Sequence, residues 1–217
     1  ILGSSKSIGL ELANTLLKNK NNIVIGISRS KINIRNKNFI QINCDLLTFN
    51  SYIKIINILK KKGIPYINNL LVSLRDRSGK KNNIENEFKI LIFNPIKFFK
   101  KLNDNGFIKK DKINSTVFIG SALDSSLSSF ANKNYLLPRQ SLKYLIEDLA
   151  YEYKDVNLRF FCIAPFIFIK KENMKLLNYK NDLEKNINNL SNYKIIKYKE
   201  IVEIILFLFS KKSILLN

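Results

Sequence analysis

The sequence has no histidine and only two cysteines, and this scarcity excludes several kinds of site. Without histidine there is no serine–histidine–aspartate triad and none of the usual zinc sites, so we expect no metal. Cys44 and Cys162 are too few for a disulfide framework. Chains with so little cysteine are typical of reducing compartments, and we expect this one in the cytoplasm.

Long hydrophobic runs are also missing. The longest, residues 201–209, is broken by Glu203 and falls short of the ~20 apolar residues that cross a bilayer, so we expect no membrane-spanning segment. The hydrophobic fraction of 46% over 217 residues is enough for a full core. We therefore expect one domain over residues 1–217, with the start of its first strand and its last strand missing, since only Ile1 and Leu2 precede the first turn.

Acidic residues are scarce, because 17 Asp and Glu stand against 37 Lys and Arg and leave a net charge of +20. A charge of this size is compatible with a nucleic-acid partner. However, the lysines are scattered, apart from short runs such as residues 60–62, and they accompany the abundant Asn, Ile and Phe that AT-rich codons produce. Recognition patches are normally clustered, so we expect a solvated basic surface, and nucleic-acid binding through the lysines is the weaker alternative.

Strand and helix signals alternate along the whole chain. Continuous β-branched runs predict buried strands, and apolar residues at helical spacing predict the helices between them. This pattern predicts a doubly wound parallel sheet covered on both faces, a three-layer α/β/α, Rossmann-like fold. Besides a strand ending at Leu2, the predicted strands are residues 23–27, 39–42, 67–72, 116–119 and 158–164, and the predicted helices are 10–17, 52–62, 84–102 interrupted at Pro95, 135–153 and 200–210, with a polar lid over 173–192.

A glycine–serine turn, residues 3–9, joins the first strand to the first helix. Gly3 permits a tight turn, Gly9 permits close helix–strand packing, and the helix N-terminus offers N–H groups to a pyrophosphate. The same residues also make ordinary loops. The second predicted strand ends at Ser28-Arg29-Ser30, where an acid would bind a free ribose 2′-hydroxyl and an arginine suits a 2′-phosphate. Arg29 therefore favours NADP over NAD if a dinucleotide binds; otherwise it is a solvent-exposed arginine.

Taken in order, these features resemble the short-chain dehydrogenase/reductase family over essentially the whole chain. The family's opening motif, Thr-Gly-x-x-x-Gly-Ile-Gly, appears as residues 2–9 with Ser7 in place of the middle glycine. Asp45 stands where the family contacts adenine, and Pro165 follows the last predicted strand as in the family. The resemblance thus implies an NADP cofactor held by Gly3, Ser5, Ile8, Gly9, Arg29, Asp45 and Pro165.

The resemblance also implies a catalytic set. Ser121 matches the family's serine that orients the carbonyl, Tyr135 its general acid/base, and Asn94 its proton-relay residue. Arg139 stands one helical turn after Tyr135, where the family has a lysine that lowers the tyrosine pKa from ~10. Read alone, Tyr135 could be a core or interface tyrosine, Ser121 a turn former, and Asn94 part of a proline kink.

Four departures from the family leave two functions open. Arg139 replaces the lysine, Leu74-Arg75 replaces Ala-Gly, Phe166 replaces a glycine, and Pro138 stands between Tyr135 and Arg139. If the helix begins at Pro138, the tyrosine–arginine geometry is lost; if it begins near Asn134, the geometry survives. The first hypothesis is an NAD(P)(H)-dependent oxidoreductase that reduces carbonyls or oxidises alcohols. The second is a catalytically impaired relative kept for binding or assembly.

The expected partners follow from the same resemblance. The substrate would be a small carbonyl or alcohol compound, and the basic surface would suit an acidic or carrier-bound one. Family members assemble through their two long helices, here residues 84–102 and 135–153, so we expect a homo-oligomer.

Overall fold

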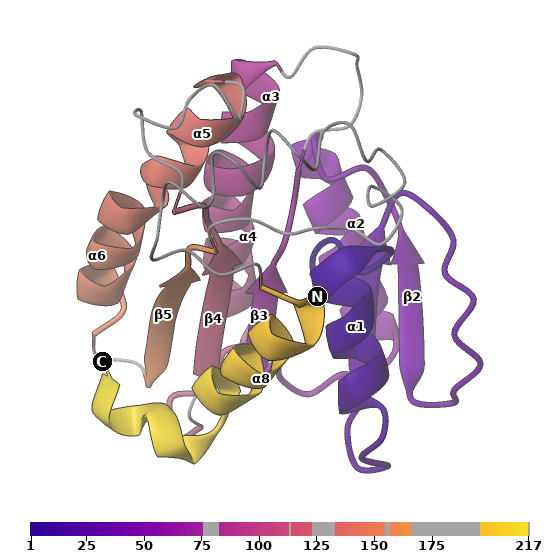
Figure 1. The fold of residues 1–217 in the computed structure, drawn as a ribbon. Helices are drawn as coiled ribbons and strands as arrows, with labels where there is room; N and C mark the ends of the chain where they lie inside the picture. The colour runs from indigo at the N-terminus through magenta and orange to yellow at the C-terminus, as the bar shows by residue number, and fades with distance from the viewer. Residues whose placement is uncertain (76–82, 113, 123–132, 155–156, 166–195, 217) are drawn as a thin grey trace.

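The computed structural model describes residues 1–75, 83–112, 114–122, 133–154, 157–165 and 196–216. Phe166 and the predicted lid over residues 173–192 lie outside them. Within them the predicted alternation of strands and helices is present (Figure 1). The elements are α1 (Ser7–Leu16), β1 (Val24–Ser28), β2 (Phe39–Asn43), α2 (Phe49–Lys61), β3 (Asn69–Val72), α3 (Ile84–Phe88), the π-helix η1 (Lys89–Phe93), α4 (Asn94–Asp104), β4 (Asn114–Ile119), α5 (Lys133–Gln140), α6 (Leu142–Glu152), β5 (Leu158–Ile163), α8 (Tyr198–Phe209) and the 3-10 helix η4 (Lys211–Leu216).

The strands pair in parallel, as the apolar runs predict. β1 pairs with β2, and β4 lies between β3 and β5. Leu2 joins the two groups, because it bridges Ile27 of β1 and Val72 of β3. The resulting order is β2, β1, Leu2, β3, β4, β5. From Leu2 the chain adds β1 and β2 on one side of the sheet and then β3, β4 and β5 on the other side. This is the order of a doubly wound dinucleotide-binding fold.

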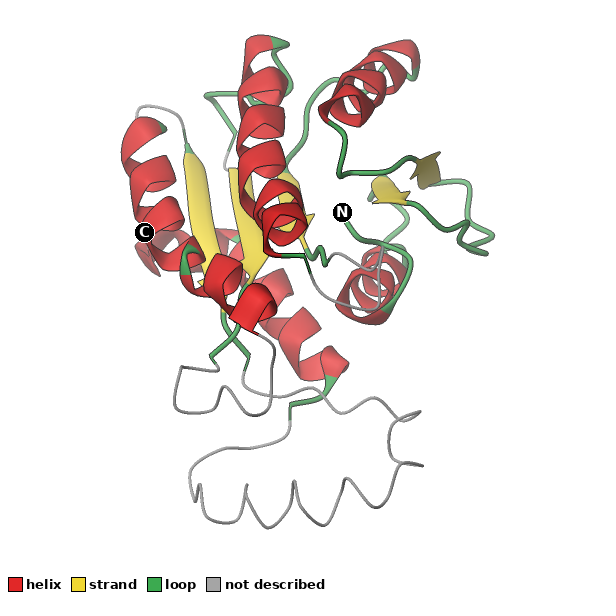
Figure 2. Ribbon diagram, turned by 90° about the horizontal axis from the view of Figure 1, so that it is seen from above, coloured by secondary structure: helices red, strands yellow, loops and turns green. Residues whose placement is uncertain are grey.

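Helices cover both faces of this sheet (Figures 1 and 2). On one face α1 and α8 pack together over β3 and β4, with Leu12, Leu71, Val117 and Ile205 fully buried between them. On the other face the apolar sides of α2, α4 and α6 form the larger core cluster. The predicted three-layer α/β/α architecture is therefore confirmed.

The predicted helix over residues 84–102 has a different interior. It is three consecutive pieces, α3, η1 and α4, and the irregular turn lies before Pro95 rather than at it. The backbone N–H of Asn94 donates to the carbonyl oxygen of Lys89, five residues back. Pro95 follows as the second residue of α4, in the first turn of an α-helix, where a missing N–H is tolerated.

The predicted helix over residues 135–153 is two helices, α5 and α6, that meet at Ser141. α5 begins at Lys133, so Pro138 lies inside it. Tyr135 and Arg139 therefore share one helix, one turn apart. Of the two alternatives for Pro138, the helix start near Asn134 is the correct one.

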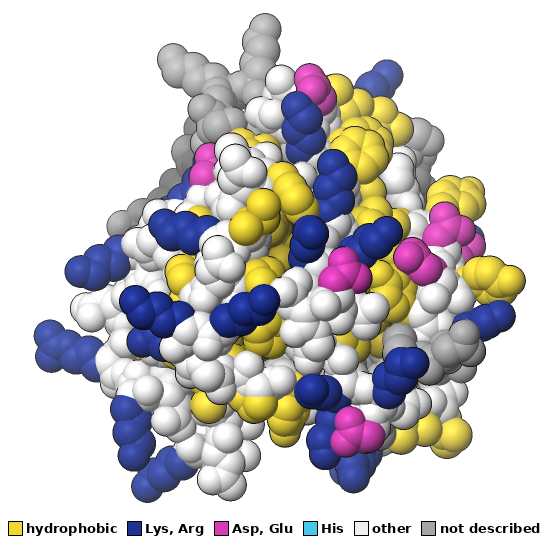
Figure 3. All heavy atoms as spheres, turned by 180° about the vertical axis from the view of Figure 1, so that it is seen from behind, with side chains coloured by type: hydrophobic (Ala, Val, Ile, Leu, Met, Phe, Trp, Pro, Cys, Tyr) yellow, Lys and Arg dark blue, Asp and Glu magenta, His cyan; other side chains and the backbone are white. Residues whose placement is uncertain are grey.

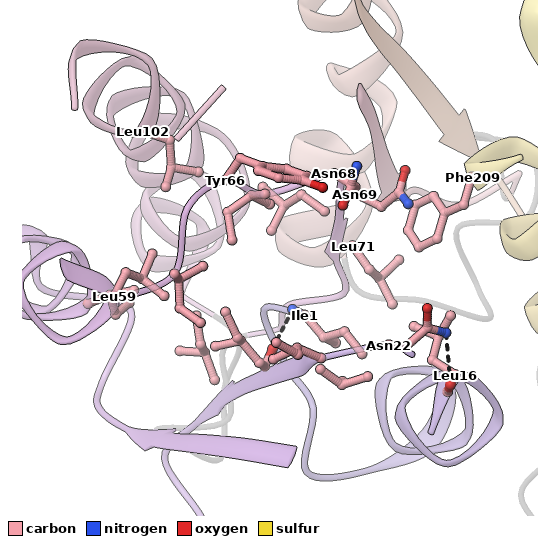
Figure 4. Close-up of a pocket in the computed structure, with 18 of the residues that line it drawn as sticks. Ile1, Leu16, Asn22, Leu59, Tyr66, Asn68, Asn69, Leu71, Leu102 and Phe209 are labelled. Carbon is pink, nitrogen blue, oxygen red and sulfur yellow. Dashed lines mark hydrogen bonds between the residues drawn. The ribbon is translucent and has the colours of Figure 1, made fainter. Parts of the chain in front are cut away.

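A pocket of about 300 Å³ opens at the amino ends of β1 and β3 (Figure 4). Its lining is mostly apolar, with Leu59, Leu71 and Leu102 among the walls. The backbone nitrogen of Ile1 donates to the carbonyl oxygen of Ile25 over 2.8 Å. This pocket is at the edge of the sheet opposite to the predicted site residues, which follow the carboxyl ends of the strands.

The charged surface agrees with the scattered lysines of the sequence. On the face behind the view of Figure 1, Lys and Arg side chains are spread among hydrophobic ones without gathering in one place (Figure 3). In the part of the chain that the structure describes, no helix is both long and apolar enough to span a bilayer.

Candidate cofactor and catalytic site

The glycine turn has room for glycine alone at two positions. Gly3 has φ +90°, and a Cβ there would lie 2.1 Å from the backbone oxygen of Ser73. A Cβ on Gly9 would lie 2.2 Å from the backbone oxygen of Gly3. Both contacts are far inside van der Waals distance. The two glycines thus allow the turn, α1 and the end of β3 to approach one another closely.

Ser7 stands where the family motif has its middle glycine, and its backbone is in a conformation that favours glycine. Its φ is +53°, in the left-handed region, and Ser7 is the one described non-glycine residue with a positive φ. A left-handed conformation costs an ordinary L-residue about 1–2 kcal/mol. Ser7 thus has a conformation that glycine adopts at little cost and serine does not.

The start of α1 is suited to an anion. The helix has no capping side chain and no acidic residue in its first turn, so its leading N–H groups are not neutralised locally. Ile8 is buried in the core and anchors this turn, while Ser5 is half-buried. Lys6 is exposed in the same turn and adds a positive charge. We did not select Lys6 from the sequence, although its place inside the glycine–serine turn was the available signal.

Two further predicted cofactor residues, Arg29 and Asp45, are exposed just beyond β1 and β2. The hydroxyl of Ser28 donates a 2.8 Å hydrogen bond to the backbone oxygen of Ser30, and Arg29 lies between these two residues. The Oδ1 of Asp45 accepts from the backbone N–H of Leu47 over 3.0 Å. Both side chains therefore project from locally ordered segments at the carboxyl edge of the sheet.

Asn94 is buried and braces the segment that follows Asp45. Its Nδ2 donates to the backbone oxygens of Leu46 and Leu47, each over 3.0 Å. The first residue of α4 is thereby tied to the loop after β2. The amide donors of Asn94 are thus occupied by the protein itself.

Arg139 is buried and bonded on several sides. Its Nη1 lies 2.9 Å from Oε2 of Glu87, and the exposed fractions of the two side chains are 3% and 0%. Its Nη2 donates to the backbone oxygen of Leu74 over 2.9 Å, and its Nη1 also donates to that of Tyr135 over 3.1 Å. Arg139 therefore fastens α5 to α3 and to the segment after β3.

Glu87 was not selected from the sequence. The available signal was its helical spacing, because Glu87, Leu91 and Asn94 share one face of the helix, and Leu91 has to be buried. An acid on a buried face needs a basic partner. Nothing in the local sequence identifies that partner as Arg139, which is 52 residues away.

Two arginines lie over the ring of Tyr135. The guanidinium carbon of Arg139 is 3.7 Å from the ring centroid, and that of Arg75 is 4.8 Å from it. Arg75 is exposed, Tyr135 is half-buried and Leu74 is buried in the core. A Cβ on Gly3 would lie 3.3 Å from Cδ2 of Leu74. The glycine turn, the end of β3 and α5 are therefore contiguous at the carboxyl edge.

Ser121 and Pro165 are brought together by the last paired strands. The backbone N–H of Gly120 donates to the backbone oxygen of Ile163 over 2.8 Å. The backbone N–H of Ala122 donates to the backbone oxygen of Pro165 over 3.1 Å. Ser121 lies between these two bonds and is half-buried, while Pro165 is buried. The structure thus places both residues at the carboxyl ends of β4 and β5, the edge at which doubly wound folds bind ligands.

Comparison with solved structures identifies the architecture. The L-sorbose reductase of Gluconobacter frateurii, complexed with NADPH and L-sorbose, superposes with a TM-score of 0.75 at 15% identity, covering 98% of this chain and 89% of that one. The chain has the short-chain dehydrogenase/reductase fold. The resemblance seen in the sequence is therefore confirmed for the architecture of the chain.

Two other structures with this fold extend the comparison. A 4-hydroxyisoleucine dehydrogenase complexed with NADH and succinate has a TM-score of 0.70 at 17% identity, with coverage of 98% and 91%. An NADPH-bound short-chain oxidoreductase from Pseudomonas aeruginosa PAO1 is described as containing an atypical catalytic centre. It superposes with a TM-score of 0.73 at 16% identity, covering 98% of this chain and 89% of that one. No protein-family model and no curated protein sequence matches the chain.

Proposed function

We propose that the chain is an NADP(H)-dependent oxidoreductase of the short-chain type, a single cofactor-binding domain over residues 1–217 that reduces a small carbonyl compound or oxidises the corresponding alcohol. The observation that carries this proposal is the contiguity of Tyr135, a buried guanidinium one turn later, and the glycine turn at the carboxyl edge of the sheet. The solved structures with this fold include complexes with NADPH and with NADH.

The residues present fit a dinucleotide. The uncapped start of α1, together with Gly3, Ser5, Ile8 and Gly9, would hold the pyrophosphate. Arg29 would take the ribose 2′-phosphate, for which its exposed, planar group is suited, and this supports NADP over NAD. Asp45 and Pro165 would complete the cofactor-binding set, beside the adenine and the nicotinamide respectively. When bound in its reduced form, the cofactor supplies a hydride to the carbonyl carbon.

The chain's own residues would supply the proton. Tyr135 would donate its hydroxyl proton to the carbonyl oxygen as the new C–H bond forms, so that the C=O double bond becomes C–OH. The hydroxyl of Ser121 would donate a hydrogen bond to the same oxygen. Arg139 would be the electrostatic partner of Tyr135, and a water held by Asn94 would return a proton from solvent. Because its amide donors bond the loop after β2, Asn94 would hold that water through an oxygen atom.

Replacing one oxygen atom tests this assignment. We expect the purified chain to oxidise NADPH faster than NADH with a panel of ketones and 3-oxoacyl thioesters, measured by absorbance. Tyr135→Phe should lower that rate by about 10²–10⁴-fold, because it removes only the proton donor. Tyr144→Phe, which changes a tyrosine that is 69% exposed on α6, is the matched control and should leave the rate unchanged. Retention of activity in Tyr135→Phe would contradict the proposal.

The rival function, a catalytically impaired relative kept for binding or assembly, is favoured by the bonds of Arg139. Its guanidinium is held by Glu87, Leu74 and Tyr135, whereas the family lysine is free to reach the cofactor. A rise in NADPH fluorescence on binding, with no consumption by any carbonyl in the panel, would support this function.

We also propose that copies of the chain associate. Phe93, at the junction of η1 and α4, is 51% exposed, and Tyr151 on α6 is 74% exposed. Hydrophobic side chains are visible between the basic ones on the face of Figure 3. A homo-oligomer would cover them. A cytoplasmic location is proposed on the two free cysteines.

A further inference from the structure

A positive charge lies next to the predicted acid/base, and it is carried by a residue that has no counterpart in the family motif. Arg75 follows β3 where the family has a glycine, and its guanidinium carbon is 4.8 Å from the centroid of the Tyr135 ring. Planar guanidinium groups stack on aromatic rings and keep their N–H edges available for an anion. The contact therefore holds Arg75 beside the side chain to which the proposed function assigns the proton transfer.

The second guanidinium on the same ring does not supply a net charge. Arg139 is paired with Glu87 in a buried contact of 2.9 Å, and its other bonds go to backbone oxygens. Among the residues that the structure describes, no carboxylate forms an ion pair with Arg75. Within the described part of the chain, the excess positive charge over Tyr135 is therefore that of Arg75.

We infer that Arg75 is an anion-recognition residue for the substrate, so that the chain acts on carbonyl compounds carrying a carboxylate or phosphate group close to the carbonyl. This inference rests on the proposed function for the reaction itself and goes beyond it in naming the substrate class. Arg75 makes the contact through its N–H edge while Tyr135 meets the carbonyl oxygen. A hydrogen bond between charged partners is short, directional and sensitive to the loss of either partner.

Matched acid and ester substrates test this inference directly. Pyruvate, acetoacetate and levulinate each have a methyl ester of nearly the same shape without the charge. We expect the wild-type chain to reduce the acids with higher kcat/KM than their esters. Arg75→Met should lower kcat/KM for the acids by about 10–100-fold and leave the esters nearly unchanged. Arg75→Lys should keep part of the preference, since it retains the charge without the planar fork.

A binding measurement decides the inference even if no substrate of the panel is turned over. Titration calorimetry should detect succinate binding to the wild-type chain and none of dimethyl succinate, with at least about tenfold weaker succinate binding in Arg75→Met. Arg35→Met is the matched control, because it removes one charge from an exposed residue between β1 and β2. It should bind succinate as the wild type does.

The outcomes separate this inference from the proposed function. Equal succinate binding by wild type and Arg75→Met would overturn the inference, whatever the activity. It would also be overturned if Arg75→Met weakened NADPH binding while the acid-to-ester ratio stayed the same, because Arg75 would then serve the cofactor. Activity retained in Tyr135→Phe would overturn the proposed reaction but not the anion site.

Discussion

The two ends of the candidate site depart from the family in different ways. In the glycine turn only Ser7 differs, and its positive φ lies in the left-handed region that favours glycine. At the other end, Leu74, Arg75 and Arg139 all differ, and they contact one another or Tyr135. Where the path of a turn requires a left-handed residue, a residue that replaces glycine has to adopt that left-handed conformation too. A cluster defined by charge can be rebuilt, provided that each buried charge has a partner.

We expect the largest effect on stability when the partner of Arg139 is removed. Glu87→Gln keeps the shape of the side chain and leaves a buried guanidinium without its counter-charge. Loss of one member of a buried ion pair costs about 3–5 kcal/mol, and we expect a decrease of about 3 kcal/mol in the free energy of unfolding, because glutamine can still accept a hydrogen bond. Urea denaturation followed by circular dichroism measures it.

Two further variants make that result interpretable. Glu85→Gln is the matched control on the same helix, since Glu85 pairs with Lys89 in an exposed i, i+4 contact that water screens; its unfolding midpoint should stay nearly unchanged. The double change Glu87→Leu with Arg139→Met should be more stable than Glu87→Gln, because no unpaired charge remains buried. If Glu87→Gln unfolds at the same urea concentration as the wild type, the ion pair adds nothing to the stability of the fold.

The glycine turn should respond to bulk rather than to charge. In Gly9→Ala the added Cβ meets a backbone oxygen at 2.2 Å, and the chain has to shift to relieve the contact. We expect a loss of about 2–3 kcal/mol in unfolding free energy and weaker NADPH binding, measured by urea denaturation and by NADPH fluorescence.

Gly63→Ala provides the contrast within the same chain. Gly63 has φ +63° but open space around its Cβ position, so only the conformational cost of about 1 kcal/mol applies. NADPH binding should be unaffected there. An equal loss of stability in the two glycine variants would mean that the contact between Gly9 and Gly3 is not what constrains the turn.

The fold was predictable because its signals are local. Largely apolar runs placed each described strand within a few residues of its observed position, and their separation by helices predicted the parallel order. The site was predictable only in part. The contact between Arg139 and Glu87, and the stacking of Arg75 on Tyr135, join residues far apart in the sequence, and a side chain's partner across such a distance leaves no periodic trace. The π-helix before Pro95 was likewise missed, since its i−5 hydrogen bond depends on tertiary packing.

The smallest expected effect is a gain. Ser7→Gly restores the residue that the left-handed conformation at φ +53° favours. Relief of that strain, less the greater backbone entropy of glycine in the unfolded chain, should raise the free energy of unfolding by about 0.5–1 kcal/mol. The thermal midpoint should rise by a few degrees. Ser5→Gly, in the same turn but with no positive φ, should lower stability slightly instead. If both variants raise the free energy of unfolding, the backbone strain is spread over the whole turn and is not confined to Ser7.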